Sequence, residues 1–231
     1  DAVSDRDFVI EFLAAGAILA MHLSRLGEEI VLWSSSEFAF LELPDAFATG
    51  SSMMPQKKNP DVAELVRGKT GKVYGALVNL LTLLKGLPLS YNRDLQDDKP
   101  PVFEAADTLL ASLNVLARML PRLDIGAAAM REAAGGFSLA TELADHLVER
   151  GLPFRQAHEV VGNVVRWCVD QRRELETLTA KELATFSPLL GPAARRCLTL
   201  DSALARRRLR GGTARANVAR RLDELAILGF A

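Results

Sequence analysis

Three long segments of this chain carry apolar residues at steps of three and four, a spacing that leaves few folds open. They cover residues 5–33, 59–84 and 97–120. Such spacing places the apolar side chains on one face of a helix. At 1.5 Å per residue the first helix would be roughly 40 Å long, which is typical of a helical bundle and not of a compact α/β domain. The pattern therefore predicts an all-α fold built on a long-helix bundle.

The second of these helices has two features of its own. Pro60 suits its first position, and Asn59 can cap it. A line of three glycines shares one face of the helix with Glu64; these are Gly68, Gly71 and Gly75. Each helical glycine costs about 1 kcal/mol relative to alanine, so we expect another helix to approach closely along this face. Glu64 would then lie in a tight crevice between helices.

The composition of the chain changes near residues 135–136. Before this point the long segments dominate, and after it glycine and proline separate shorter ones. We expect helices at about residues 138–150, 153–172, 179–186 and 214–228, with a capping box from Thr179 to Glu182. The sequence therefore predicts two domains: a partial central helical bundle over residues 1–125 and a small C-terminal helical domain over residues 126–231.

Charge and composition exclude several classes of protein. Hydrophobic residues make up 49% of the chain, which suffices for a substantial core and is unlike a disordered chain. The net charge is −1, and the arginines of residues 206–221 lack interleaved aromatic residues, so we expect solvated or inter-subunit ion pairs there and neither nucleic acid nor membrane as a partner. Two cysteines make no disulfide framework, which favours a reducing cytoplasm.

The beginning of the chain carries its own information. It is polar and lacks an initiator methionine, so we expect no signal peptide and a piece of a longer protein. The longest unbroken apolar stretch, residues 12–21, is too short to span a bilayer.

Two polar loops carry side chains that could bind a substrate or react with it. The loop of residues 49–60 combines hydroxyl groups, two lysines and backbone N–H groups leading into a helix, which suits a substrate with carboxylates. The loop of residues 90–99 emerges at the other end of the second helix, about 35 Å away for roughly 24 residues. One site that used both loops would need two subunits. The alternative is that both are ordinary solvated turns.

The first loop resembles a known signature. The motif G-S-S-x-M-P-x-K-x-N-P of the fumarase/aspartase superfamily is matched without a break by residues 50–60, Gly-Ser-Ser-Met-Met-Pro-Gln-Lys-Lys-Asn-Pro. The variant with Gln-Lys-Lys is similar to argininosuccinate lyase, whose relatives include the delta crystallins of the lens. Residues 1–8, 87–99 and 211–213 also resemble that family, so the resemblance covers essentially the whole chain.

The resemblance implies a fold and a reaction. It implies part of a homotetramer built around a bundle of long helices, with three sequence regions from three subunits at each active site. The reaction would be the reversible β-elimination of argininosuccinate to fumarate and L-arginine, a step of arginine biosynthesis. Neither a metal nor an organic cofactor is implied.

The resemblance also assigns roles to individual residues. Ser51 matches the catalytic serine, the proposed base, although chemistry alone does not separate it from Ser52. Glu64 matches the acidic residue that orients a catalytic histidine. The remaining matches are residues expected to bind the substrate, with Lys57 holding a carboxylate: Lys57, Asn59, Tyr91, Gln96 and Lys99.

Part of the family pattern is missing from this sequence. The region with a serine-arginine-asparagine-aspartate run and the Thr-His region that supplies the catalytic histidine are both absent. His22, His146 and His158 are better interpreted as structural. The chain therefore looks like the C-terminal half of a lyase and is expected to be inactive alone. The alternatives are a non-catalytic helical protein of the delta-crystallin type, used for structure or oligomerisation, and another fumarate-releasing lyase of the superfamily.

Overall fold

The computed structural model describes residues 3–50, 52–54 and 57–229. It divides into two compact units, Asp1–Ala127 and Ala128–Ala231. Helices dominate both, and the strands among the described residues are only two residues long. The prediction of an all-α fold is confirmed.

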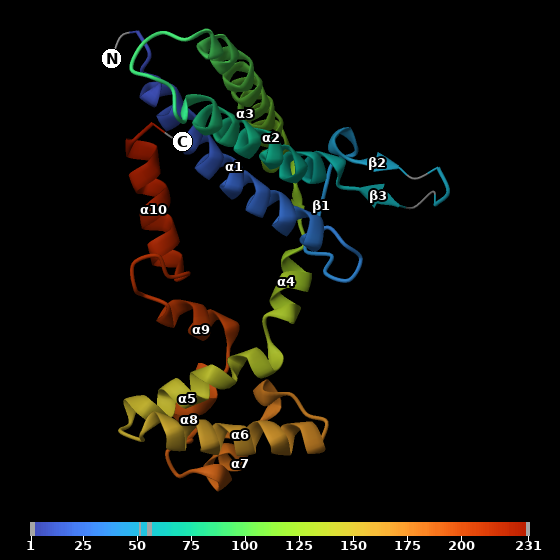
Figure 1. The fold of residues 1–231 in the computed structure, drawn as a ribbon. Helices are drawn as coiled ribbons and strands as arrows, with labels where there is room; N and C mark the ends of the chain where they lie inside the picture. Colours follow the sequence, from blue (N-terminus) through green and yellow to red (C-terminus); the bar gives the residue numbers. More distant parts are fainter. Residues whose placement is uncertain (1–2, 51, 55–56, 230–231) are drawn as a thin grey trace. The chain divides into compact units, whose positions relative to one another are not determined.

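Three long helices form the first unit. They are α1 (Asp7–Trp33), α2 (Asp61–Leu84) and α3 (Lys99–Met119), and they lie side by side as elongated rods (Figure 1). The short helix η2 (Arg93–Asp98) leads into α3, and η3 (Leu120–Arg122) follows it. All three long helices predicted from apolar spacing are present.

The predicted start of α2 is wrong in detail. Asn59 does not cap the helix, because it belongs to a strand and its side-chain amide donates to the Thr49 carbonyl. Pro60 precedes the helix at the capping position and does not occupy its first turn. Strand pairing of the preceding loop has replaced side-chain capping here.

Close helix contact occurs at other glycines than those predicted. A Cβ added to Gly27 of α1 would lie 2.8 Å from the Ala63 carbonyl oxygen of α2, and one added to Gly16 would lie 2.9 Å from Leu109 of α3. Around Gly68, Gly71 and Gly75, an added Cβ would meet no described atom within 4 Å. The expected close approach on that face of α2 is therefore not made within the part of the chain that the structure describes.

The three helices leave much apolar surface uncovered. In α1, Val9 and Leu13 are buried, whereas Phe8 is 69% and Phe12 46% exposed. Exposed apolar side chains also lie on α2 and α3 within this unit; they include Leu65, Val78, Phe103 and Leu110. By length and composition alone α1 could cross a membrane, but core helices of soluble proteins satisfy the same criterion.

Two small ribbons accompany the three helices. Strand β1 (Leu41–Glu42) pairs antiparallel with β4 (Asp124–Ile125), and the one-turn helix η1 (Asp45–Phe47) follows β1. Strand β2 (Thr49–Gly50) pairs antiparallel with β3 (Lys58–Asn59), so that Thr49 is opposite Asn59. The second ribbon is a hairpin that projects from the N-terminal end of α2 (Figure 1).

The second unit consists of shorter helices around its own core. In chain order the elements from the junction onward are α4 (Ala127–Ala133), η4 (Gly136–Leu139), α5 (Ala140–Glu149), α6 (Phe154–Asp170), η5 (Leu175–Thr177), α7 (Ala180–Phe186), α8 (Pro192–Cys197), α9 (Leu200–Arg206) and α10 (Arg215–Ile227). Leucines from α5 to α8 and their connections are fully buried at its centre. The capping box predicted from Thr179 to Glu182 is formed in both directions.

A buried polar network joins α5 to α9 in the second unit. The Glu142 side chain is 2% exposed and pairs with Arg206, 3.2 Å from its Nε, and with Arg207. These two arginines were expected to be solvated or to pair between subunits. They instead neutralise a buried carboxylate of the same unit.

Candidate active site

The signature loop is held as a β-hairpin. The pairing of Thr49 with Asn59 and of Gly50 with Lys58 closes a loop that returns the chain to the start of α2. The Asn59 amide reinforces it by donating to the Thr49 carbonyl at 3.3 Å, and the Thr49 hydroxyl donates to the Asp61 carboxylate. Near the tip, the Lys57 N–H donates to the Met54 carbonyl at 3.0 Å. Ser51, the predicted base, lies outside the described residues.

The two adjacent lysines of the hairpin have different environments. The Lys58 ammonium lies 2.6 Å from Glu42 and 2.7 Å from Asp45, and these hydrogen bonds raise the pKa of Lys58. The side chain of Lys57 is exposed and makes no hydrogen bond or ion pair with a described residue. No carboxylate of the described residues compensates the positive charge of Lys57, whereas Lys58 is already neutralised.

A pocket of about 930 Å³ lies beside the hairpin within the first unit. Three predicted site residues, Lys57, Asn59 and Glu64, line it. The segment after α1 supplies another wall, with the three consecutive hydroxyl groups of residues 34–36. This pocket brings together the Lys57 ammonium group, an amide and hydroxyl groups, which are suitable donors for an anionic substrate.

Glu64 lies one turn into α2 and is exposed. The prediction that it occupies a tight crevice between helices is wrong for this chain, because the described residues place no second helix against that face of α2. Its carboxylate is therefore accessible to groups outside the described residues. That accessibility is compatible with a role in orienting a group from another chain segment.

The second polar loop lies at the opposite end of α2. Tyr91 is 53% exposed and Gln96 is exposed, and neither side chain makes a hydrogen bond to a described residue. The Lys99 ammonium instead lies 2.8 Å from a carboxylate oxygen of Asp98. Helix α2 has 24 residues. It therefore separates this loop from the hairpin by about 36 Å at 1.5 Å per residue.

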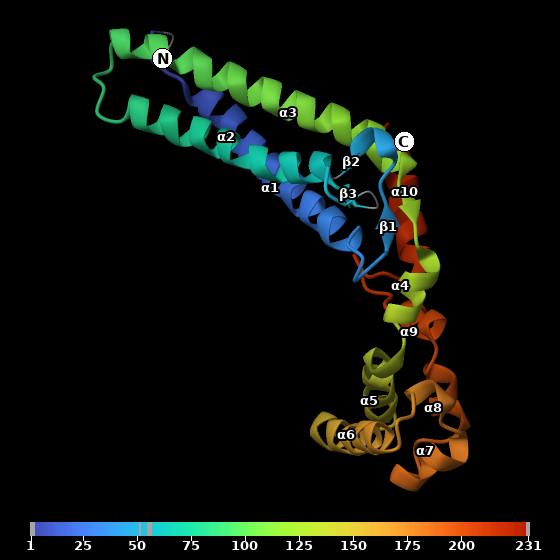
Figure 2. The same ribbon diagram turned by 90° about the vertical axis from the view of Figure 1, so that its right-hand side faces the viewer.

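The structure thus divides the predicted site residues into two groups. Lys57, Asn59 and Glu64 line one pocket. Tyr91, Gln96 and Lys99 lie around the far end of α2, as Figures 1 and 2 show for the connection between α2 and α3. One chain does not bring the two groups together, so a site that uses both must combine two copies.

No histidine is among the described residues that line this pocket. His22 and His158 are exposed on helices, and His146 is buried in the second unit. Burial and the nearby Arg150 lower the pKa of His146. Among the described residues no three His, Cys, Asp or Glu side chains are grouped as metal ligands would be. The structure therefore adds no candidate for the proton donor.

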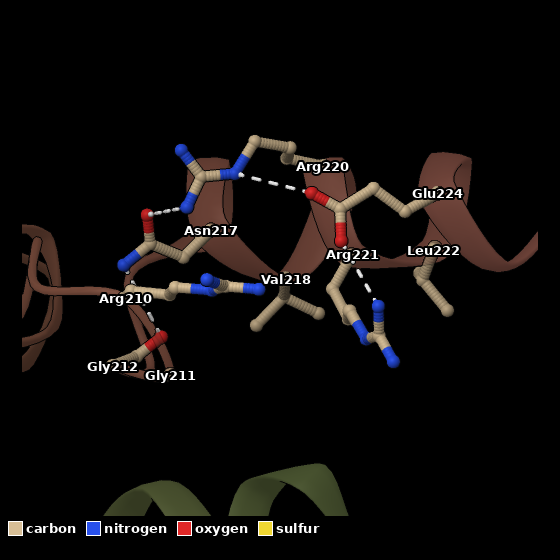
Figure 3. Close-up of a pocket in the computed structure, with 9 residues that line it drawn as sticks. All are labelled: Arg210, Gly211, Gly212, Asn217, Val218, Arg220, Arg221, Leu222 and Glu224. Carbon is tan, nitrogen blue, oxygen red and sulfur yellow. Dashed lines mark hydrogen bonds and ion pairs between the residues drawn. The ribbon is translucent and has the colours of Figure 1, made fainter.

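Another pocket, of about 440 Å³, lies against α10 in the second unit (Figure 3). It contains the Gly211 and Gly212 backbone and three arginines. Arg221 lies 3.0 Å and Arg220 3.9 Å from the Glu224 carboxylate, and Arg220 also donates to the Asn217 amide oxygen. Since none of the predicted site residues lines it, the pocket at the hairpin is the candidate active site.

The long-helix bundle and its signature hairpin place the chain in the fumarase/aspartase superfamily. The family model described as Lyase matches residues 1–75. A crystal structure of EDDS lyase in complex with formate superposes with a TM-score of 0.86 and 29% identity, covering 97% of this chain and 46% of that one. A class II fumarase from Schistosoma mansoni, at 19% identity, has a TM-score of 0.70 over 86% of this chain and 39% of its own and shows the same fold.

Within that superfamily the chain belongs to the argininosuccinate lyase family. The family model described as Argininosuccinate lyase C-terminal matches residues 137–205. Argininosuccinate lyases of Pseudomonas entomophila and Desulfatibacillum aliphaticivorans are 57% and 56% identical, each over 94% of this chain and 47% of their own length. The chain thus spans about half the length of the curated relatives it matches.

Proposed function

We propose that this chain carries the signature-loop part of an argininosuccinate lyase, which splits argininosuccinate into fumarate and L-arginine by β-elimination. The observation that carries the proposal is the hairpin that presents Lys57, whose ammonium has no partner among the described residues, to a pocket beside Asn59 and Glu64. The relatives at 52–57% identity supply the substrate, since each is named argininosuccinate lyase.

The elimination needs a base and a group that stabilises negative charge. Ser51 is the proposed base, and it removes the proton from the carbon beside a carboxylate. The resulting carbanion delocalises its charge into that carboxylate, which becomes more negative. A preorganised cation at this position stabilises the transition state more than the bound substrate. Lys57 can supply this cation because its ammonium is not compensated by a carboxylate of the described chain.

The other predicted residues bind the substrate or orient groups that other segments and chains supply. Asn59 contributes a polar contact to the substrate. Glu64 orients a histidine that another segment supplies, which its exposure permits. Tyr91, Gln96 and Lys99 bind the substrate in a neighbouring copy's site, because α2 separates them from Lys57 in their own chain. A homotetramer with shared sites is the assembly we propose, and the exposed apolar faces of the three long helices support association.

Several further properties belong to the same proposal. We infer that residues 1–125 form the bundle domain and residues 126–231 the C-terminal domain, that the enzyme is cytoplasmic, and that it needs no metal or organic cofactor. The two cysteines, which form no disulfide with each other, agree with a reducing compartment.

A chimera tests the proposal. The N-terminal half of the Pseudomonas entomophila relative is placed before this chain, and fumarate release is followed by ultraviolet absorbance with argininosuccinate, adenylosuccinate, aspartate and malate. We expect turnover of argininosuccinate alone, and almost none from the 231-residue chain by itself, because a general acid or base contributes about 10²–10⁴-fold. A chimera that assembles but turns over another of these substrates would refute the assignment.

The choice of base is tested in the same chimera. Ser51→Ala should abolish turnover while argininosuccinate still binds, since the proton acceptor acts in the transition state. Ser52→Ala is the matched control and should keep most of the activity. The opposite result would identify Ser52 as the base.

A further inference from the structure

We propose that Asp98 is a positioning residue of the active site, which holds the Lys99 ammonium in place by binding it and Arg6 with its two carboxylate oxygens. This inference rests on the proposed function, in which Lys99 contacts the substrate. It adds a residue that does not contact the substrate itself but acts through one that does.

The geometry at Asp98 is that of a shared carboxylate. One oxygen, Oδ2, accepts from Arg6 Nε at 2.5 Å, and the other, Oδ1, accepts from Lys99 Nζ at 2.8 Å. The Asp98 side chain is only 7% exposed and that of Arg6 16% exposed, whereas the Lys99 side chain is 62% exposed. A buried anion is therefore paired on one side with a half-buried cation and on the other with an exposed one.

The contact with Arg6 fixes where the carboxylate lies. Arg6 immediately precedes α1, and its carbonyl accepts from the N–H groups of Val9 and Ile10 in the first turn. Asp98 is the last residue of η2, and the buried Leu95 holds that short helix against the bundle. Burial would raise the pKa of Asp98, but the hydrogen bonds from Lys99 and Arg6 hold it below its usual range. Asp98 is therefore an ionised carboxylate held in a fixed position.

Lys99 gains its orientation from this carboxylate. It is the first residue of α3, and its long side chain would otherwise be free in solvent. Its other contact with the described residues is a long one, 3.5 Å to the Leu95 carbonyl. Fixing the ammonium before substrate arrives reduces the entropy lost on binding. Tyr91 and Gln96, by contrast, have no such partner among the described residues.

Lysine acetylation of the chain, quantified by mass spectrometry, tests the contact without an activity assay. An ammonium held by a carboxylate must leave it before its nitrogen can react. Asp98→Asn should therefore raise the labelling rate of Lys99 about two- to fivefold, the range that a partly exposed ion pair supports. Lys85, an exposed lysine at the end of α2 without a side-chain partner among the described residues, is the internal control and should not change. An unchanged Lys99 rate overturns the inference.

A double-mutant cycle in the active chimera tests the role. Asp98→Asn should lower kcat/KM by about 10- to 100-fold, as expected when a binding group is misplaced by an ångström, mostly through KM. If Asp98 acts through Lys99, the same change made in a Lys99→Met background should cost little more. Effects that multiply independently would overturn the inference.

Two further variants separate positioning from stability. Arg6→Gln removes the other partner of Asp98, so it should lower the melting temperature while changing KM less than Asp98→Asn does. Asp98→Glu keeps the charge and should restore part of the KM. A wild-type chimera without lyase activity would refute the proposed function, and the labelling result would then decide the Asp98–Lys99 contact alone.

Discussion

Replacing each lysine of the hairpin in turn should separate catalysis from stability. Lys57→Met in the chimera removes a charge that no described carboxylate compensates. A single preorganised electrostatic donor is worth about 10²–10³ in rate, so we expect kcat/KM for argininosuccinate to fall by that factor. The melting temperature should stay unchanged, because the Lys57 side chain is exposed and has no described partner.

Lys58→Met is the matched control one residue away. It breaks the contacts to Glu42 and Asp45, which connect the hairpin to the segment after α1. These pairs are largely exposed, so their loss should lower the melting temperature slightly and kcat/KM less than tenfold. Lys57→Arg, which keeps the charge, should recover part of the activity.

The assays are fumarate release for kcat/KM and thermal unfolding for stability. Activity above about a tenth of wild type in Lys57→Met would refute the electrostatic role of this lysine, since a transition-state contact cannot cost so little. A larger loss of activity in Lys58→Met than in Lys57→Met would show that the paired lysine is the functional one.

Three further outcomes are expected. The chain should be oligomeric at micromolar concentration by light scattering, because its long helices expose apolar faces, and a stable monomer would contradict this. The pKa of His146 lies below its usual 6.5, so on acidification the unfolded state binds a proton that the folded state does not. The urea midpoint of the wild type should therefore fall as the pH is lowered from about 7 to about 5.5. The exposed control His158→Gln should show the same fall, and His146→Gln a smaller one. Thr179→Ala should cost about 1 kcal/mol of stability in urea unfolding by removing a capping box, and Thr179→Ser should restore it.

The positions of the helices could be predicted from apolar spacing, but the face that each one buries could not. Both faces of α1 are apolar, because Phe8 with Phe12 and Val9 with Leu13 are each spaced by four residues. The structure buries the second pair and exposes the first. Apolar spacing does not distinguish a residue packed within one chain from one that packs between chains. The buried Thr70, whose hydroxyl donates to the Ala20 carbonyl, could not be predicted either, because an apolar pattern leaves out polar residues.

The shortest helices and the ion-pair partners of the hairpin lysines could not be predicted from the sequence either. Helices α8 and α9 have six and seven residues, too few for a periodic pattern to stand out. In the candidate site the residue types of the hairpin could be read, yet nothing in the order Lys57-Lys58 says which ammonium is neutralised. That depends on Glu42 and Asp45, which only the fold brings near.

The length of α2 has a consequence for the way such a chain can change during evolution. The helix carries a candidate site segment at each end, so in the proposed assembly its 24 residues act as a spacer between two active sites. Inserting one residue would move one end by about 1.5 Å and rotate it by about 100° relative to the other. Inserting seven residues would nearly restore the relative orientation of the two ends but would move them about 10 Å apart from their original spacing. Insertions and deletions should therefore be excluded from this helix.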